Sequence, residues 1–222
     1  MYYTIDIMKK WLVAHRGAPN EAKENTLSAF AEAKKYPIGY IEFDVHVTKD
    51  DVAIIHHDPE IKGRSIAKST YAELLVTDPE LAHFEDVVLT NNGQPLIVEL
   101  KSSGAAPHVA LYLSTHPKSL ATSFMDTELI SLSHLDIAKS RMLLAQHKHP
   151  IGLIKKAKRH NFGGVTVNKW YLTPSFYFRA RRNHLAVFVY TVNSPHWARF
   201  MRIMFPNALI CTDRPDILSR LN

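Results

Sequence analysis

The chain has 222 residues, of which 46% are hydrophobic and 22% are charged. That composition is typical of a globular protein and excludes a disordered or fibrous chain. The 27 Lys and Arg residues exceed the 21 Asp and Glu residues, which gives a formal net charge of +6. A basic excess suits an anionic ligand. However, the basic residues form only short clusters, and no nucleic-acid-binding motif accompanies them. We therefore expect a solvated basic surface and no nucleic-acid partner.

The start of the chain shows no targeting or membrane signal. Too few apolar residues follow Lys9 and Lys10 to form the core of a signal peptide. No apolar stretch approaches the roughly 20 residues that a membrane-spanning helix needs. We therefore expect a cytoplasmic protein. No Gly/Ser linker divides the chain, so we expect a single domain over residues 1–222. Met8 could be the natural start, which would make Met1–Ile7 an extension.

Short apolar runs separated by polar breaks predict eight strands. In chain order they are Trp11–Ala14, Tyr40–Val45, Leu96–Leu100, Leu120–Phe124, Arg141–Ala145, Gly164–Val167, Val187–Thr191 and Ala208–Thr212. Most of them lack a strict alternation of apolar and polar residues, which is typical of strands buried on both faces. The single cysteine, Cys211, lies in the last run, so no internal disulfide can form and its side chain is expected to be buried.

Helical patterns fall between the predicted strands. One begins with Leu27, Phe30 and Ala31. Another has a one-faced apolar pattern, made by Trp197, Phe200, Met201, Met204 and Phe205. Thr173-Pro174 and Ser194-Pro195 each place a capping residue before a proline, which predicts helix starts. Strands that alternate with helices imply parallel pairing with right-handed crossovers.

The spacing of the strands favours a closed barrel. Eight units share the chain at about 28 residues each, enough for one strand, one helix and two short loops. We therefore predict a small (β/α)8 (TIM) barrel. A doubly wound open sheet is the alternative, but the Gly-x-Gly-x-x-Gly turn that it favours is absent. The run Val52–Ile55 follows the second strand too closely for a helix, so it predicts a short hairpin insertion there.

Polar side chains gather at the ends of the predicted strands. His15-Arg16-Gly17 follows the first strand and Thr212-Asp213 follows the last, while the second strand contains Glu42 and Asp44 and the third contains Glu99. The carboxyl ends of barrel strands form one rim, where active sites of such barrels lie. We therefore expect residues far apart in the sequence to meet at this rim.

The carboxylates predict a metal site. Glu42 and Asp44 are two positions apart, so both side chains would point into the barrel from one strand. Two buried carboxylates repel each other, and a divalent cation would neutralise them, with Glu99 as a third ligand. Oxygen ligands of this kind favour Mg²⁺ or Ca²⁺. The alternative is that Glu42 and Asp44 lie on the exposed polar face of a hairpin.

Two histidines and an arginine could act beside such a site. His15 and His57 could serve as general acid and base. Arg16 could bind a phosphate through its planar guanidinium group. Taken singly, each of these residues could equally be a structural or surface residue.

Their order along the chain is more specific than any one of them. The motifs are His15-Arg16-Gly17, Glu24-Asn25-Thr26, Glu42-x-Asp44, Thr48-x-Asp50, His57-Asp58, Glu99-x-Lys101, Ser123-Phe124, Thr191-Val192-Asn193 and Thr212-Asp213-x-Pro215. This ordered set, which covers nearly the whole chain, resembles the glycerophosphodiester phosphodiesterase family.

The resemblance implies a barrel enzyme that cleaves glycerophosphodiesters, a small-molecule substrate, into glycerol 3-phosphate and an alcohol. By similarity the metal ligands would be Glu42, Asp44 and Glu99, and the acid/base pair would be His15 and His57. The phosphoryl oxygens would be contacted by Arg16 and Lys101. In this family the neighbouring glycerol hydroxyl is thought to attack phosphorus, which gives a cyclic phosphate that water then opens.

Two departures from the family pattern concern the substrate. Tyr190 stands where the family usually has Trp, so its ring would form the aromatic contact with the glycerol. Ile61–Ser65 is shorter than the insertion that usually covers the mouth, which leaves the alcohol undetermined. The alternatives are a lysophospholipase D or phospholipase C-like enzyme and a non-catalytic phosphate-binding barrel. An apolar rim for an acyl chain could come from Phe124, Trp170, Tyr171, Phe176 and Phe178. The sequence does not determine the oligomeric state.

Overall fold

The computed structural model describes residues 11–146 and 150–221, with a parallel barrel at the centre. Its strands agree with the eight predicted runs to within about two residues at each end. They are β1 (Leu12–His15), β2 (Tyr40–Val47), β7 (Leu96–Leu100), β8 (Leu120–Ser123), β9 (Met142–Gln146), β10 (Gly164–Asn168), β11 (Ala186–Tyr190) and β12 (Ala208–Thr212). The predicted Met1–Ile7 extension lies outside the described residues.

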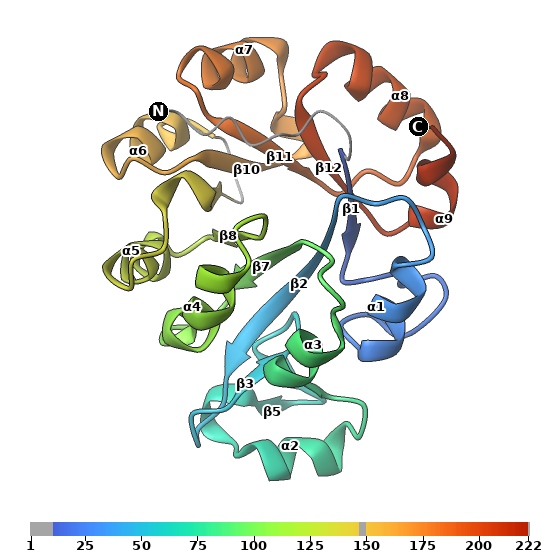
Figure 1. Ribbon diagram of the computed structural model, residues 1–222, viewed down its shortest axis with the longest axis vertical. Coiled ribbons are helices and arrows are strands. Elements are labelled where there is room, and N and C mark those ends of the chain that lie inside the picture. The colour runs from blue at the N-terminus through green and yellow to red at the C-terminus, as the bar shows by residue number, and fades with distance from the viewer. Residues whose placement is uncertain (1–10, 147–149, 222) are drawn as a thin grey trace.

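The barrel closes because β1 pairs in parallel with both β2 and β12 (Figure 1). This confirms the predicted small (β/α)8 barrel. Alternate side chains on each strand point in opposite directions. On β2, Ile41, Phe43 and Val45 belong to the core between strands and helices, and the Phe43 ring lies 5.4 Å from that of Phe30. Tyr40 belongs to the separate apolar cluster inside the barrel. Glu42 and Asp44 lie on that inner side as well.

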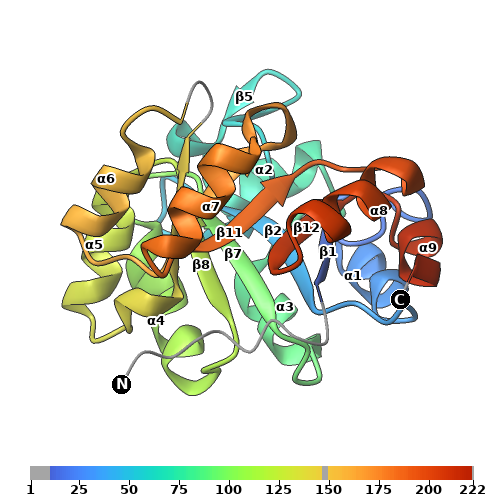
Figure 2. The same ribbon diagram turned by 90° about the horizontal axis from the view of Figure 1, so that it is seen from above.

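Helices surround the barrel, apart from α2 (Tyr71–Thr77), which lies away from it beside the insertion that follows β2 (Figures 1 and 2). The helices are α1 (Leu27–Ala33), α2 (Tyr71–Thr77), α3 (Phe84–Thr90), α4 (Ala105–Thr115), α5 (Asp126–His134), α6 (Leu153–Arg159), α7 (Pro174–Arg182), α8 (Pro195–Met204) and α9 (Pro215–Leu218). Within the described ranges, no helix has the length and apolar character needed to cross a bilayer.

The proline starts of α7 and α8 are confirmed, but one predicted face is not. The Thr173 hydroxyl accepts a hydrogen bond from the Phe176 backbone N–H, and α8 begins at Pro195 after Ser194. Met201 is buried as the helical pattern predicts. Trp197 and Phe200, which the same pattern assigned to the buried side, are instead 48% and 47% exposed. The small residue Ala198 provides the close contact with the barrel in their place.

The predicted hairpin after β2 is confirmed and is part of a larger excursion. Strand β3 (Ala53–Ile55) pairs antiparallel with β2, and β6 (Ala82–His83) pairs antiparallel with β3. The small sheet of β4 (Glu60–Ile61) and β5 (Arg64–Ser65), a 3-10 helix at Ile66–Lys68 and helix α2 lie between them. Two-residue strands are too short to give a periodic pattern in the sequence.

Candidate active site

Three acidic side chains meet inside the barrel near the carboxyl end of β2. Asp44 on β2 is paired in register with Glu99 on β7, and Glu42 lies two residues earlier on the same inner face. Glu42 and Asp44 are buried, and Glu99 is largely so. One carboxylate oxygen from each lies within 4.8 Å of the others. The structure therefore brings together the three predicted metal ligands and places Glu42 and Asp44 inside the barrel rather than on an exposed hairpin face.

Burial and the neighbouring negative charges disfavour the charged forms of Glu42 and Glu99. Burial, followed by the charges of Asp44 and Glu99, raises the pKa of Glu42 well above its ordinary value. Burial and the Asp44 charge raise the pKa of Glu99 to about 7. In the absence of a cation, the cluster therefore holds protons that isolated carboxyl groups would have lost near neutral pH.

Two basic side chains offset part of this negative charge. Arg16 Nε lies 3.2 Å from Asp44 Oδ2. Lys101 Nζ lies 3.0 Å from Glu99 Oε1 and 3.4 Å from Asp44 Oδ1. Burial would lower the pKa of Lys101, but the Glu99 and Asp44 charges outweigh it and raise the pKa. Burial would likewise lower the pKa of Arg16, but the charges of Asp44, Glu24 and Glu42 together outweigh it and raise the pKa. Both groups are therefore cationic at the mouth of the acidic cluster.

A strained turn places Arg16 at this position. Its backbone has a φ of 54°, and Gly17 follows with a φ of 91°. A Cβ at Gly17 would lie only 2.6 Å from the carbonyl carbon of Ala29, so the turn needs glycine for space as well as for conformation. The Arg16 N–H donates to the Glu42 carbonyl at 2.8 Å, which ties the turn to β2.

The donor set fits a divalent cation. Three convergent carboxylates are hard oxygen ligands, which Mg²⁺ and Ca²⁺ prefer. In the described part of the chain, Asn25 Oδ1 is buried and accepts no hydrogen bond, and the buried Glu99 Oε1 has the Lys101 ammonium at 3.0 Å as an ionic partner. Asn25 Nδ2 donates to Asp44 Oδ2 at 3.0 Å. A cation among these oxygens would satisfy acceptors that are otherwise costly to bury.

His15, at the end of β1, is held by a carboxylate from the last strand–helix loop. Its Nδ1 lies 2.5 Å from Asp213 Oδ1, and its Nε2 lies 4.0 Å from Glu42 Oε2. Asn193 Nδ2 donates to Asp213 Oδ2 at 2.6 Å, and the Asp213 N–H donates back to Asn193 Oδ1 at 2.9 Å. Burial would raise the pKa of Asp213, but the hydrogen bonds from His15 and Asn193 lower it. An ionised Asp213 therefore orients the imidazole toward the acidic cluster.

His57 reaches the same region from the segment that follows β3. Its Nδ1 lies 2.8 Å from Asp58 Oδ1, and the buried His46 donates from Nε2 to the His57 carbonyl at 3.2 Å. Burial lowers the pKa of His57, and the charges of Arg16 and Lys101 act in the same direction. His57 is therefore neutral near pH 7, the form in which an imidazole accepts a proton.

The aromatic contact predicted for Tyr190 lies beside Lys101. The Tyr190 ring meets the Phe124 ring edge to face at 6.2 Å, and Lys101 Nζ lies 6.0 Å from the centre of the Phe124 ring. Burial, then the Glu99 charge, raises the pKa of Tyr190 to about 12. The structure thus places a protonated phenol and an aromatic wall next to the acidic cluster.

Comparison with known proteins shows a similarity to one family. The model of the glycerophosphoryl diester phosphodiesterase family matches residues 15–96, which include His15, Arg16, Glu42, Asp44 and His57. A Bacillus subtilis protein with a provisional glycerophosphodiester phosphodiesterase name is 25% identical over 94% of this chain and 96% of its own length. Over residues 15–96 the chain is therefore similar to the glycerophosphoryl diester phosphodiesterase family.

Further relatives are similar over a short stretch or in fold. A glycerophosphodiester phosphodiesterase of Arabidopsis thaliana is 47% identical over 62 residues, 28% of this chain but only 16% of that relative. An Oleispira antarctica phosphodiesterase, solved with the product sn-glycerol-3-phosphate, has a TM-score of 0.78 and 19% identity over 94% of this chain and 95% of that one. At that identity the likeness shows a shared fold.

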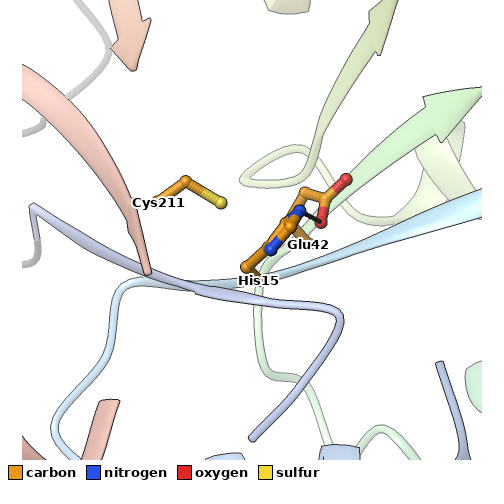
Figure 3. A group of neighbouring side chains, drawn as sticks. All are labelled: His15, Glu42 and Cys211. Carbon is orange, nitrogen blue, oxygen red and sulfur yellow. Dashed lines mark ion pairs between the residues drawn. The ribbon is translucent and has the colours of Figure 1, made fainter. Parts of the chain in front are cut away.

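Cys211 lies beside this family site as a neutral side chain (Figure 3). Its sulfur points toward His15 and Glu42, and the three residues form a second group whose ligand atoms lie within 4.8 Å of one another. Burial, then the Glu42 charge, raises the pKa of the thiol well above its ordinary value. The side chain is 1% exposed, which confirms the predicted burial. Cys211 therefore packs beneath the acidic cluster and is poorly suited to act as a nucleophile.

Sequence reasoning left two residues of this site without a role. Asn193 and Asp213 were recognised as parts of family motifs, but nothing in their spacing indicated that they pair with each other and with His15. Asn25 was likewise part of a motif whose contact with Asp44 depends on folding. The sequence feature that could have indicated a role for Asp213 is its position directly after a barrel strand, at the rim where active sites lie.

Proposed function

We propose that this chain is a metal-dependent phosphodiesterase that hydrolyses glycerophosphodiesters to glycerol 3-phosphate and an alcohol. The observation that carries the proposal is the convergence of three buried carboxylates with two cations and two histidines at one rim of the barrel. A phosphate diester is an anion. Such a rim could bind its negative charge and could accept and donate the protons that hydrolysis requires.

Glu42, Asp44 and Glu99 would hold the cation, Mg²⁺ or Ca²⁺. When bound there, it would stabilise negative charge on the phosphoryl oxygens. Arg16 and Lys101 would bind the same oxygens through charge-assisted hydrogen bonds. Their raised pKa values keep both side chains cationic throughout the physiological range.

His15 and His57 would exchange the protons. In the first step the glycerol hydroxyl next to phosphorus attacks it and loses its proton to one histidine, while the other protonates the leaving alcohol. In the second step water opens the cyclic phosphate and the two roles reverse. Because the nucleophile belongs to the substrate itself, it is already positioned, and this lowers the activation free energy by roughly 7 kcal/mol or more. Tyr190 would contact the glycerol through its ring.

The substrate prediction distinguishes this route from direct attack by water. Glycerophosphocholine should turn over, whereas its analogue without the attacking hydroxyl should not. Several head groups, choline and ethanolamine among them, should give similar kcat/KM because the leaving side has a small lid, Ile61–Ser65. Equal turnover of the two choline substrates would refute the cyclic route. Failure to turn over any glycerophosphodiester would favour a non-catalytic phosphate-binding barrel.

A lysophospholipase D remains the second candidate. Trp170, at the carboxyl end of β10, is 70% exposed and could contact an acyl chain. Turnover of lysophosphatidylcholine compared with glycerophosphocholine separates the two functions. A kcat/KM that is much larger for the lysophospholipid would favour the second.

A further inference from the structure

Acidic residues are absent from one third of this chain, although its basic clusters look scattered along the sequence. Residues 137–212 contain 13 Lys and Arg residues and neither Asp nor Glu. This segment provides β9 to β12 and helices α6, α7 and α8, which lie consecutively around one side of the barrel (Figure 1). The remaining residues hold all 21 acidic side chains. One side of the barrel wall is therefore cationic.

Exposed apolar residues occupy the rim of this cationic side. Ile151 lies between β9 and α6, Trp170 between β10 and α7, and Trp197 in the first turn of α8 after β11. Their exposed fractions are 86%, 70% and 48%. The Trp170 and Trp197 rings meet at 6.2 Å, and Phe200 continues the contact at 5.5 Å from Trp197. We refer to Ile151, Trp170, Trp197 and Phe200 as the rim patch.

One basic side chain contacts the rim patch, and others are exposed on the helices that carry it. Lys169 Nζ lies 5.3 Å from the centre of the Trp170 ring. Lys155 in α6 and Arg199 in α8 are exposed. Large apolar side chains are costly to expose to water, so a patch of them indicates a surface that binds a partner. Here the same segment of the chain is basic and contains no carboxylate.

We propose that the rim patch docks on a bilayer that contains anionic phospholipids. Indole rings favour the boundary between water and hydrocarbon, and flanking lysines and arginines are attracted to anionic head groups. A second copy of the chain would bring two cationic faces together, so self-association through this face is disfavoured. Nucleic acid would match the charge, but Ile151 has no aromatic face for base stacking and no polar group for a phosphate or a base edge.

The topology gives the docked molecule a definite orientation. All eight barrel strands are parallel, so the loops after β9, β10 and β11 lie at the same rim as His15, Lys101 and Asp213. A bilayer held by the rim patch would therefore face the mouth of the acidic cluster. The rim patch is a different surface from the carboxylate cluster. Its binding to vesicles can therefore be measured even on a chain that turns over no substrate.

The test is co-sedimentation with phosphatidylcholine vesicles prepared with and without phosphatidylglycerol. The full chain should bind the anionic vesicles, release them at high salt, and bind weakly to phosphatidylcholine alone. Tryptophan emission should shift to the blue on binding, because Trp170 and Trp197 would leave water while Trp11 is already buried. The double variant Trp170→Ala, Trp197→Ala should lose the shift and most of the binding. Lys169→Glu and Arg199→Glu should each weaken binding by about fivefold or more.

Matched variants on the other side of the molecule serve as controls. Leu111→Ala removes an exposed apolar side chain from α4, and Lys118→Glu reverses an exposed charge just before β8, at the opposite end of the barrel. Both should bind vesicles as the parent chain does, and unchanged thermal unfolding would show that all variants fold. Vesicle binding that is absent, or that falls equally in the controls, would overturn the proposal. So would binding to a DNA or RNA oligonucleotide, lost in the same variants, without binding to vesicles.

Discussion

His15 and His57 differ in how each imidazole ring is held. Asp213, itself fixed by Asn193, accepts from His15, whereas the partner of His57 is the exposed neighbouring side chain Asp58. We predict that His15→Ala and His57→Ala each lower kcat by roughly 10²–10⁴-fold, the usual effect of losing a positioned acid or base. Asp213→Asn should give a smaller loss, because the His15 ring remains but loses its ionic partner. Steady-state kinetics on glycerophosphocholine measure all three.

His56 provides the internal control for this prediction. It precedes His57 directly, so on an extended backbone its side chain points the other way. His56→Ala should therefore retain most of the activity. An essential His56 with a dispensable His57 would show that the proposed roles are assigned one residue out of register.

The sequence was sufficient to predict the residues of the acidic cluster but not their interactions. Spacing alone placed Glu42 and Asp44 on one strand face, because side chains alternate along a strand. The contact between Asp44 and Glu99 depends on the register between β2 and β7, and that of His15 with Asp213 depends on closure of the barrel. Contacts between residues about 55 and 200 positions apart have no local signal in the chain.

At the level of elements, strands were easier to predict than the helix surfaces. The β12 run Ala208–Thr212 is almost wholly apolar because both of its faces are buried, so its bounds are visible in the sequence. The α8 pattern is ambiguous, because its exposed face carries Trp197 and Phe200 as well as arginines. An apolar residue at helical spacing indicates a core face only when no other partner for that face exists.

The turn after β1 is the element on which the position of Arg16 depends. We predict that Gly17→Ala destabilises the fold by roughly 2–5 kcal/mol, because it adds backbone strain and a clash with the Ala29 backbone. Gly63→Ala is the matched control. Gly63 also has a positive φ, 79°, but nothing lies within 4 Å of an added Cβ, so about 1–2 kcal/mol is expected. Urea unfolding compares the two, and equal losses would contradict the steric account.

For the molecule as a whole, the acidic cluster links stability to pH. The pKa of Glu99 rises from an ordinary 4.5 to about 7 in the folded chain, and burial raises that of Glu42 as well. The metal-free folded state therefore binds more protons than the unfolded state between these values, and its stability falls as pH rises through that window. A cation that replaces the protons would remove this loss.

We therefore predict that metal stabilises the chain more at pH 8 than at pH 5. Thermal unfolding in chelator and in excess Mg²⁺ or Ca²⁺ at both pH values gives the comparison. At each pH, the difference in unfolding temperature between metal and chelator removes the contribution of titrating groups outside the site. An equal effect of metal at both pH values would show that protons and metal do not compete for these carboxylates.

The most direct test of the account is the turnover of glycerophosphocholine in the presence of a chelator. In the described site, the permanently charged groups that contact the three buried carboxylates are Arg16 and Lys101, so we propose that the site works with a divalent cation. Chelation should abolish the release of glycerol 3-phosphate, and added Mg²⁺ or Ca²⁺ should restore it. Full turnover in excess chelator would contradict the proposed metal site at Glu42, Asp44 and Glu99.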